Sequence, residues 1–282
     1  MTVERRCVRV IVLARRVTTP LLVAASALWL TACNLPPPPP TPGDVRADRV
    51  TASDETNTAK RARVRMELAT AYFGRGQLTT ALDEVKQAIA ADPNMGEAYN
   101  LRGLIYAALG DEATADDSFR HALQINPRDG DSMHNFGWFL CQQRRYSEAT
   151  VQFARALELP QYTGVGRTLL ARGVCEARAG QWIDAEATLR RAYEVDPGNA
   201  AIAVNLSQVL YQRGEYERAR FYVRRVNSVV EQSNAQTLWL AARIEMKLGN
   251  TQGANEFGFQ LRSRFPQSRE SSAFDRGLFD EQ

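Results

Sequence analysis

Apolar and polar positions divide the chain into three parts. An arginine-rich start at residues 1–16 is followed by an apolar run at residues 17–32. Residues 34–60 are mostly polar and rich in proline. From about residue 62 to residue 267, small and apolar residues recur at intervals of about 34. The pattern predicts a targeting segment, a linker and a folded region of repeated helical units.

The first segment has the layout of a secretory signal. Basic residues precede an apolar run that ends in small residues. The run is too short to cross a membrane comfortably, and Pro20 interrupts its start. We therefore expect residues 1–32 to be a signal peptide.

The junction Leu30-Thr31-Ala32-Cys33 resembles a bacterial lipobox, in which a small residue before the cysteine admits a peptidase. The resemblance implies cleavage before Cys33 and lipid on its sulfur and new amine. Acyl chains contribute roughly 0.8 kcal/mol per buried CH₂, so two or three anchor a protein stably. Asn34 stands where an Asp would mark retention in the inner membrane, which favours the periplasmic face of the outer membrane. A plain signal peptide, or a signal anchor with an incidental cysteine, is the alternative.

Residues 33–61 are predicted to form the lipidated cysteine and a linker. Residues 36–40 are five consecutive prolines, which favour an extended polyproline helix and cannot join an α-helix. At roughly 3 Å per residue, such a spacer would hold the folded region away from the lipid. A proline-rich ligand for aromatic grooves is the other interpretation.

Proline positions reveal the repeat in the remaining chain. Pro93 and Pro127 are 34 residues apart, and Pro197 and Pro266 follow at intervals of 70 and 69 residues, close to two repeats each. Proline closes a helix because it cannot continue one. The spacing therefore predicts pairs of helices that end at a common position.

Counted back from each proline, the residues resemble the tetratricopeptide repeat (TPR). Small residues let the two helices of a unit approach closely, large residues fill the space between units, and a glycine near the middle ends the first helix. Positions that carry the resemblance include Tyr72, Gly76, Ala81, Tyr99, Gly103, Gly110, Phe119, Phe136, Gly137, Phe153, Gly173, Gly180, Ala185, Gly214, Ala219, Ala242, Gly249 and Ala254.

The resemblance implies an all-α fold, a right-handed superhelix of about six tetratricopeptide repeats with a concave groove lined by the first helices. The repeats are predicted near residues 62–95, 96–129, 130–163, 166–199, 200–233 and 235–268. Extra residues fall in the loop from Pro160 to Gly166. Residues 268–282 are expected to form a C-terminal cap or tail with a short polar helix.

Charge argues against nucleic acid as a partner. The formal net charge is +3, but residues 1–32 hold five arginines against Glu4, a surplus of +4. Removal of the signal would leave about −1. A nucleic-acid binder usually keeps a basic surplus in its folded domain.

No residue pattern indicates catalysis. The chain has two histidines, His121 and His134, and neither has the spacing of a complete metal site. Residues 164–168 resemble a fragment of a phosphate loop but lack its lysine. We therefore expect a binding scaffold rather than an enzyme, with no cofactor, metal or small-molecule substrate.

Two cysteines remain in the folded region. Cys141 lies late in the first helix of the third repeat, and Cys175 lies in the middle of the first helix of the fourth. Export would place them in an oxidising compartment, so a Cys141–Cys175 disulfide is proposed. Two buried free thiols are the alternative, because cysteine is a common small core residue.

The segment from Met133 to Gln143 (MHNFGWFLCQQ) looks like the corresponding run of the type IV pilus biogenesis and stability lipoproteins, the PilF/PilW family. Cys175, the lipobox, the six repeats and the run at residues 264–268 fit the same family. The resemblance implies a pilotin. Such a lipoprotein binds the type IV pilus secretin and promotes its localisation and multimerisation, and thereby supports pilus assembly and twitching motility. A TPR lipoprotein that scaffolds outer-membrane protein or peptidoglycan assembly is the alternative.

A secretin segment is expected to lie across the first helices as a helix or an extended peptide. Each candidate for the groove lining has packing or idle surface as its alternative role. The candidates are Met66, Thr70, Phe73, Asn100, Leu104, His134 and Trp138.

Overall fold

Small residues facing large ones, with a helix break between them, produce a series of helical hairpins. The computed structural model describes residues 56–280, so the predicted signal peptide and Cys33 lie outside the described residues. Within that range there are thirteen α-helices and no strand. The helices are α1 (Asn57–Gly74), α2 (Leu78–Ala91), α3 (Gly96–Leu109), α4 (Glu112–Ile125), α5 (Gly130–Gln142), α6 (Tyr146–Leu157), α7 (Val165–Arg178), α8 (Trp182–Val195), α9 (Ala200–Gln212), α10 (Tyr216–Asn227), α11 (Ala235–Lys247), α12 (Thr251–Arg264) and α13 (Arg269–Asp275).

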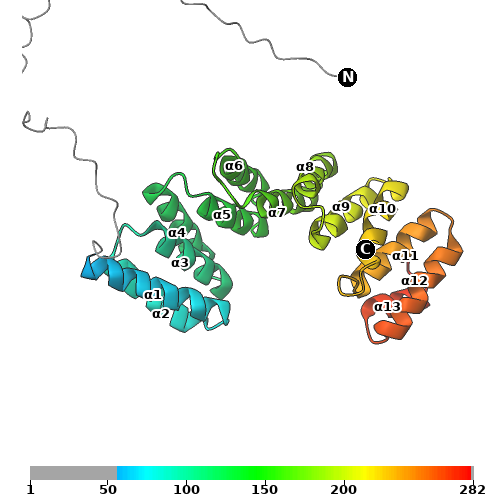
Figure 1. Ribbon diagram of the computed structural model, residues 1–282, viewed down its shortest axis with the longest axis horizontal. Coiled ribbons are helices and arrows are strands. Elements are labelled where there is room, and N and C mark those ends of the chain that lie inside the picture. The colour runs from blue at the N-terminus through cyan, green and yellow to red at the C-terminus, as the bar shows by residue number, and fades with distance from the viewer. Residues whose placement is uncertain (1–55, 281–282) are drawn as a thin grey trace, which may run out of the picture. The chain divides into compact units, whose positions relative to one another are not determined.

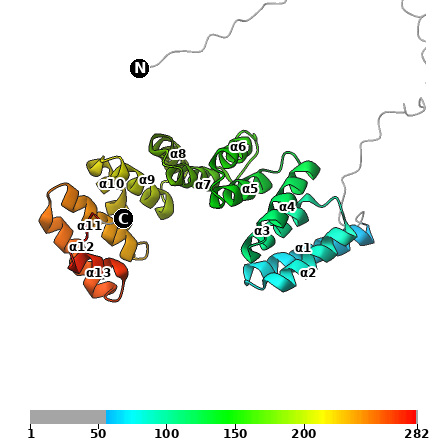
Figure 2. The same ribbon diagram turned by 180° about the vertical axis from the view of Figure 1, so that it is seen from behind.

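The first twelve helices form six pairs that follow one another in chain order (Figures 1 and 2). Every helix from α2 to α12 packs on both the helix before it and the helix after it in the chain. The first helices also contact one another in sequence, α3 with α5, α5 with α7, α7 with α9 and α9 with α11. The predicted all-α TPR architecture is confirmed.

Within a pair, the two helices approach closely at a small residue of the first helix. A Cβ atom on Gly103 or on Gly137 would lie 2.8 Å from the ring of Phe119 or Phe153, the residue sixteen positions later. A Cβ atom on Gly173 would lie 2.5 Å from Leu189 in the same relation. These three large side chains are within 1% of complete burial. Any side chain at the glycine would therefore push the pair apart.

The last pair is closed by α13. Gly258 in α12 stands sixteen positions after Ala242, where the other pairs place a large residue, and the ring of Phe274 fills the space at Gly258 instead. A short helix is present where it was expected, at Arg269–Asp275, and its residues are mostly polar, with Phe274 as the large apolar exception. Its Ser268 cap and exposed arginines are polar, but Phe274 is 9% exposed and packs against Trp239.

The first helix begins earlier than the first predicted repeat. The Thr56 side chain accepts a hydrogen bond from the backbone N–H of Ala59, and α1 starts at Asn57 rather than near residue 62. A threonine cap satisfies a free donor of the first turn, and the proline pattern does not record it. Between residues 56 and 280, none of the helices has both the length and the apolar character needed to cross a membrane.

The turn inside each pair needs a left-handed residue. Seven positions after the small residue, φ is positive in all six pairs, and glycine stands there in five of them. The exception is Arg144, with φ of 58°. A residue with a Cβ atom pays roughly 1–2 kcal/mol for this conformation, whereas glycine adopts it freely.

This difference predicts opposite effects at equivalent turns. Gly180→Ala should lower the free energy of unfolding by about 1 kcal/mol, because alanine must adopt positive φ. Arg144→Gly should leave it unchanged or raise it by up to about 1 kcal/mol, since strain is removed but the unfolded chain gains freedom. Thermal unfolding followed by circular dichroism measures both. A neutral Gly180→Ala would contradict the argument, and so would a clearly destabilising Arg144→Gly.

Candidate functional site

The predicted groove begins at the first two pairs. Met66 and Thr70 of α1 line a surface hollow of about 420 Å³. The Thr70 hydroxyl donates to the Met66 carbonyl at 2.9 Å, which fixes its orientation on the helix. The other lining residues are Arg63, Glu67, Met95 and Glu97. Thioethers beside charged groups make this hollow suitable for an amphipathic segment.

Two other candidates serve mainly as packing. Phe73 is partly buried against the cluster formed by α1, α2 and α3. Leu104 packs against that cluster and also against the next one, around α3 to α6. Both side chains therefore join neighbouring pairs, which is the packing alternative weighed for them.

Asn100 and His134 connect successive first helices. The Asn135 amide of α5 donates to the Asn100 side-chain oxygen of α3 at 3.2 Å. His134 Nδ1 of α5 lies 2.8 Å from the hydroxyl of Thr168 in α7. Side chains predicted to face a partner thus also hold the row of first helices in register.

The His134 contact extends into the loop that carries the extra residues. This connection, residues 158–164, is longer than the four-residue connection 126–129 of the preceding pair. The Tyr162 hydroxyl lies 2.7 Å from Thr168 Oγ1, and its ring covers Gly130, where a Cβ atom would meet it at 2.5 Å. The Thr168 hydroxyl can donate a hydrogen bond to Nδ1 of a neutral His134 and accept one from the Tyr162 hydroxyl.

Burial lowers the pKa of His134 to about 4, and the nearby charge of Arg167 acts in the same direction. Arg167 itself forms an ion pair with Asp131 of α5, which adds another link between α5 and α7. The neutral imidazole is therefore the form that fits this contact at neutral pH.

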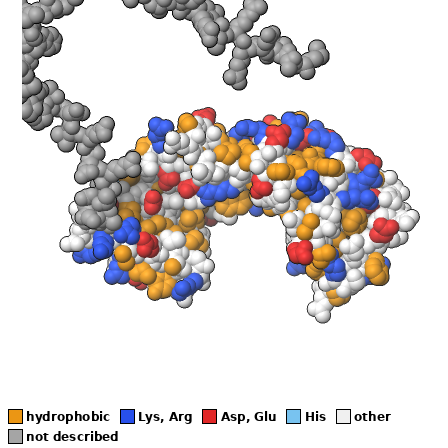
Figure 3. All heavy atoms as spheres, in the orientation of Figure 1, with side chains coloured by type: hydrophobic (Ala, Val, Ile, Leu, Met, Phe, Trp, Pro, Cys, Tyr) orange, Lys and Arg blue, Asp and Glu red, His pale blue; other side chains and the backbone are white. Residues whose placement is uncertain are grey.

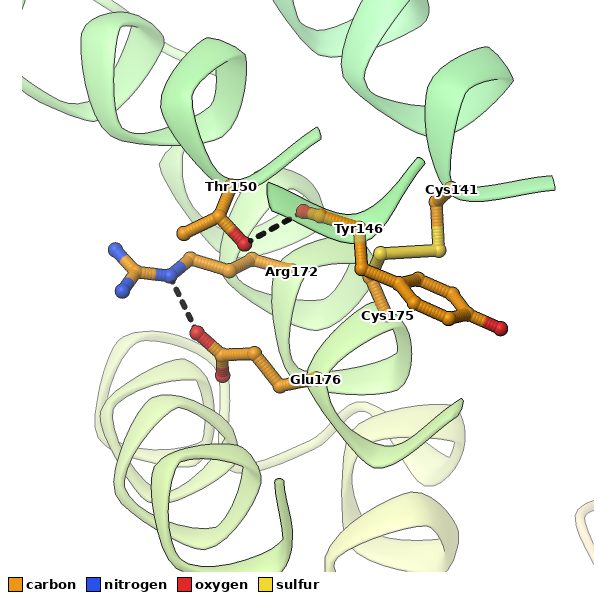
Figure 4. Close-up of a disulfide and its surroundings, with 6 residues drawn as sticks. All are labelled: Cys141, Tyr146, Thr150, Arg172, Cys175 and Glu176. Atoms are coloured by element: carbon orange, nitrogen blue, oxygen red, sulfur yellow. Dashed lines mark hydrogen bonds and ion pairs between the residues drawn. A yellow bond between two sulfur atoms is a disulfide. The ribbon is translucent and has the colours of Figure 1, made fainter. Parts of the chain in front are cut away.

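A disulfide joins the same two helices farther along. Cys141 of α5 and Cys175 of α7 are bonded, with Cα atoms 5.8 Å apart, and each is 1% exposed (Figure 4). For a closed loop of this size, the chain-entropy model gives about 3–4 kcal/mol of stabilisation. Beside it, Arg172 Nε donates to the buried carboxylate of Glu176 at 2.7 Å (Figure 4). The α5–α7 contact is thus fixed at several points along its length.

Trp138, the last candidate, is partly buried on α5. The guanidinium of Arg178, at the end of α7, lies 5.0 Å from its ring centroid. This cation–π contact covers part of the ring and leaves an aromatic and basic surface next to the disulfide.

Sequence reasoning missed the partners of these candidates. Thr168, Tyr162 and Arg178 were not singled out, although aligning the repeats would have placed Thr168 and Arg178 on the neighbouring first helix. Tyr162 lies in one of the two seven-residue connections between pairs, and the other, residues 228–234, has no tyrosine. Within residues 56–280, no cluster of three His, Cys, Asp or Glu side chains could hold a metal ion.

Acidic and basic side chains are intermixed on the viewed face of the helical region, with small apolar areas between them (Figure 3). A nucleic-acid interface would instead gather cations on one face. The arrangement of the first helices suits contacts with a polypeptide, through hydrogen bonds, aromatic rings and small hollows.

The lowered pKa of His134 predicts a pH-dependent stability. As pH falls from 6.5 to about 4, the unfolded chain binds a proton that the folded chain does not, so stability is full above this window and is lost within it. After allowance for solvent screening, we expect His134 to account for about 1–2 kcal/mol of that loss. Thermal midpoints at pH 7 and 4.5 should fall less in His134→Gln than in the parent, while His121→Gln keeps the parental fall. Equal falls in all three proteins would contradict this role.

Comparison with known proteins agrees with the repeat architecture. Models of the tetratricopeptide repeat match residues 66–130, 130–159 and 176–238. The chain is 24% identical over 209 residues to the type IV pilus assembly protein PilF of Pseudomonas aeruginosa, a match that covers 74% of this chain and 82% of PilF.

Solved structures give the same relationship. The crystal structure of PilW, described as a widely conserved type IV pilus biogenesis factor, matches with a TM-score of 0.70 and 32% identity over 75% of this chain and 97% of PilW. The structure of Pseudomonas aeruginosa PilF matches with a TM-score of 0.69 and 22% identity, over 79% of this chain and all of PilF. The chain therefore belongs to the PilF/PilW family of tetratricopeptide-repeat proteins of type IV pilus biogenesis.

Proposed function

We propose that this protein is a pilotin of the outer membrane. Anchored through lipid on Cys33, it binds the type IV pilus secretin and promotes the localisation and multimerisation of that protein. The observation that carries the proposal is the relationship to PilW, at 32% identity over 97% of the PilW chain. The lipobox ending at Cys33 supports the membrane anchor.

The properties of the helical region support a binding role rather than catalysis. Its first helices are tied by the Cys141–Cys175 disulfide and by the His134–Thr168 hydrogen bond, so their shared surface is preorganised. A preorganised surface loses little conformational entropy when a segment binds to it. The hollow beside Met66 and Thr70 offers one place for an apolar side chain of the secretin.

The lipid anchor would determine where in the cell envelope the protein acts. Lipid on Cys33 would keep the helical region, at the end of its linker, on the inner side of the outer membrane, where secretin multimers must form. A protein without lipid should fold normally, because the helical region forms a compact unit of its own. It would bind the secretin but leave it misplaced.

Deletion of the gene and complementation with single variants test the proposal. The deletion should abolish detergent-resistant secretin multimers and twitching motility, and the parental gene should restore both. Cys33→Ser should produce folded protein but leave the secretin outside the outer-membrane fraction. Cys7→Ser is the matched control, because it falls in the predicted signal peptide and should complement fully.

The result also separates the proposal from its alternative. Normal secretin multimers in the deletion strain, together with altered outer-membrane proteins or cell wall, would contradict the pilotin role. That outcome would support a scaffold for another envelope-assembly machine.

A further inference from the structure

Phe279 and Asp280, at the C-terminal end of the described residues, contact α11, which is the first helix of the sixth pair. Arg243 Nε of α11 donates to the Phe279 carbonyl oxygen at 2.9 Å. Lys247 Nζ donates to Asp280 Oδ1 at 2.5 Å. The ring of Phe279 lies 5.2 Å from the Trp239 ring, measured between centroids. This C-terminal segment thus makes a main-chain, an ionic and an aromatic contact with α11, and its Phe279 ring also lies 5.5 Å from the Phe274 ring of α13.

The three contacting residues of α11 share one face. Trp239, Arg243 and Lys247 are spaced four residues apart, which aligns them along a helix. Trp239 and Arg243 flank Ala242 as His134 and Trp138 flank Gly137 in α5. The C-terminal segment therefore lies on the face that lines the predicted groove in the earlier repeats.

The Arg243 side chain is held ready for this contact. It is 9% exposed, and its guanidinium lies 4.7 Å from the ring centroid of Tyr211 in α9. Stacking on an aromatic ring leaves its planar edge free to donate hydrogen bonds. The donor to the Phe279 carbonyl is consequently positioned by α9 and α11 rather than by the segment itself.

A hollow of about 670 Å³ adjoins the contact. It is bordered by Trp239 and Arg243 of α11, by Leu278, and by Arg269 and Arg276 at the two ends of α13. Glu270 is the acidic residue of its lining, so arginines outnumber carboxylates three to one there. This balance favours a segment that carries negative charge.

We propose that this face of α11 is a binding site for a partner segment in which an aromatic residue is followed by an acidic residue. In the free protein, Phe279 and Asp280 occupy the site and show how such a segment is held. A partner must displace them to bind. The proposal rests on these contacts and on the basic hollow beside them, and it does not depend on the secretin as the partner.

Tethering explains why the segment occupies its site without high intrinsic affinity. A short linker gives an attached ligand an effective concentration in the mM range. A segment whose free dissociation constant is about 0.1 mM would then fill the site roughly nine-tenths of the time or more. Removing the tethered copy should raise the affinity for the same peptide in solution about tenfold.

A fluorescently labelled peptide with the sequence of residues 276–282, RGLFDEQ, tests this directly by fluorescence anisotropy. A chain that ends at Arg276 should bind the peptide about tenfold more tightly than the full chain. Replacing Phe by Ala in the peptide should remove binding. In the shortened chain, Lys247→Ala should weaken binding several-fold, whereas Lys86→Ala on α2 is the matched control and should not.

A second variant covers the case in which the shortened chain does not fold. The full-length double variant Phe279→Ala, Asp280→Ala frees the site but keeps the chain intact, and it should bind the peptide as tightly as the shortened chain. Circular dichroism identifies the folded variants. Folded variants that bind the peptide no better than the parent would overturn the proposal, whatever the outcome of the secretin experiments.

Discussion

The close approach of two helices at a small residue is the contact on which the other features depend. Gly103, Gly137 and Gly173 leave room for a large side chain of the partner helix, and that side chain fills the centre of the pair. A pair packed in this way still has an apolar side, which the next first helix covers. Repetition of this contact places the first helices in a row, and the row is the surface available to a partner.

The middle of the row is reinforced beyond ordinary packing. Three interactions join α5 to α7 at different positions along the two helices. They are the Asp131–Arg167 ion pair, the His134–Thr168 hydrogen bond and the Cys141–Cys175 disulfide. A binding surface that spans separate pairs keeps its shape only when those pairs cannot slide past one another. The same residues that stabilise the array therefore also prepare it for a partner, which is consistent with the mixed roles of His134 and Trp138.

Sequence predicted what repeats and missed what occurs once. Proline spacing and small residues located the helix pairs, because each pair solves the same packing problem. The left-handed Arg144 was missed because it departs from the glycine of the other turns. Tyr162 and Phe274 were missed for a related reason: Tyr162 lies in a connection between pairs, outside the repeated positions, and Phe274 closes the end of the array. The contacts of Phe279 and Asp280 with α11 were missed as well, because these two residues lie outside the repeats.

The central claim is that the secretin binds the row of first helices, and site-specific photocrosslinking in cells tests it most directly. A photoreactive amino acid at Thr70, which is exposed on α1 beside the hollow, should crosslink to the secretin. The same amino acid at Val151, which is 54% exposed on the second helix α6, should not. Crosslinks from Val151 and none from Thr70 would place the partner on the other side of the helix pairs and contradict the account.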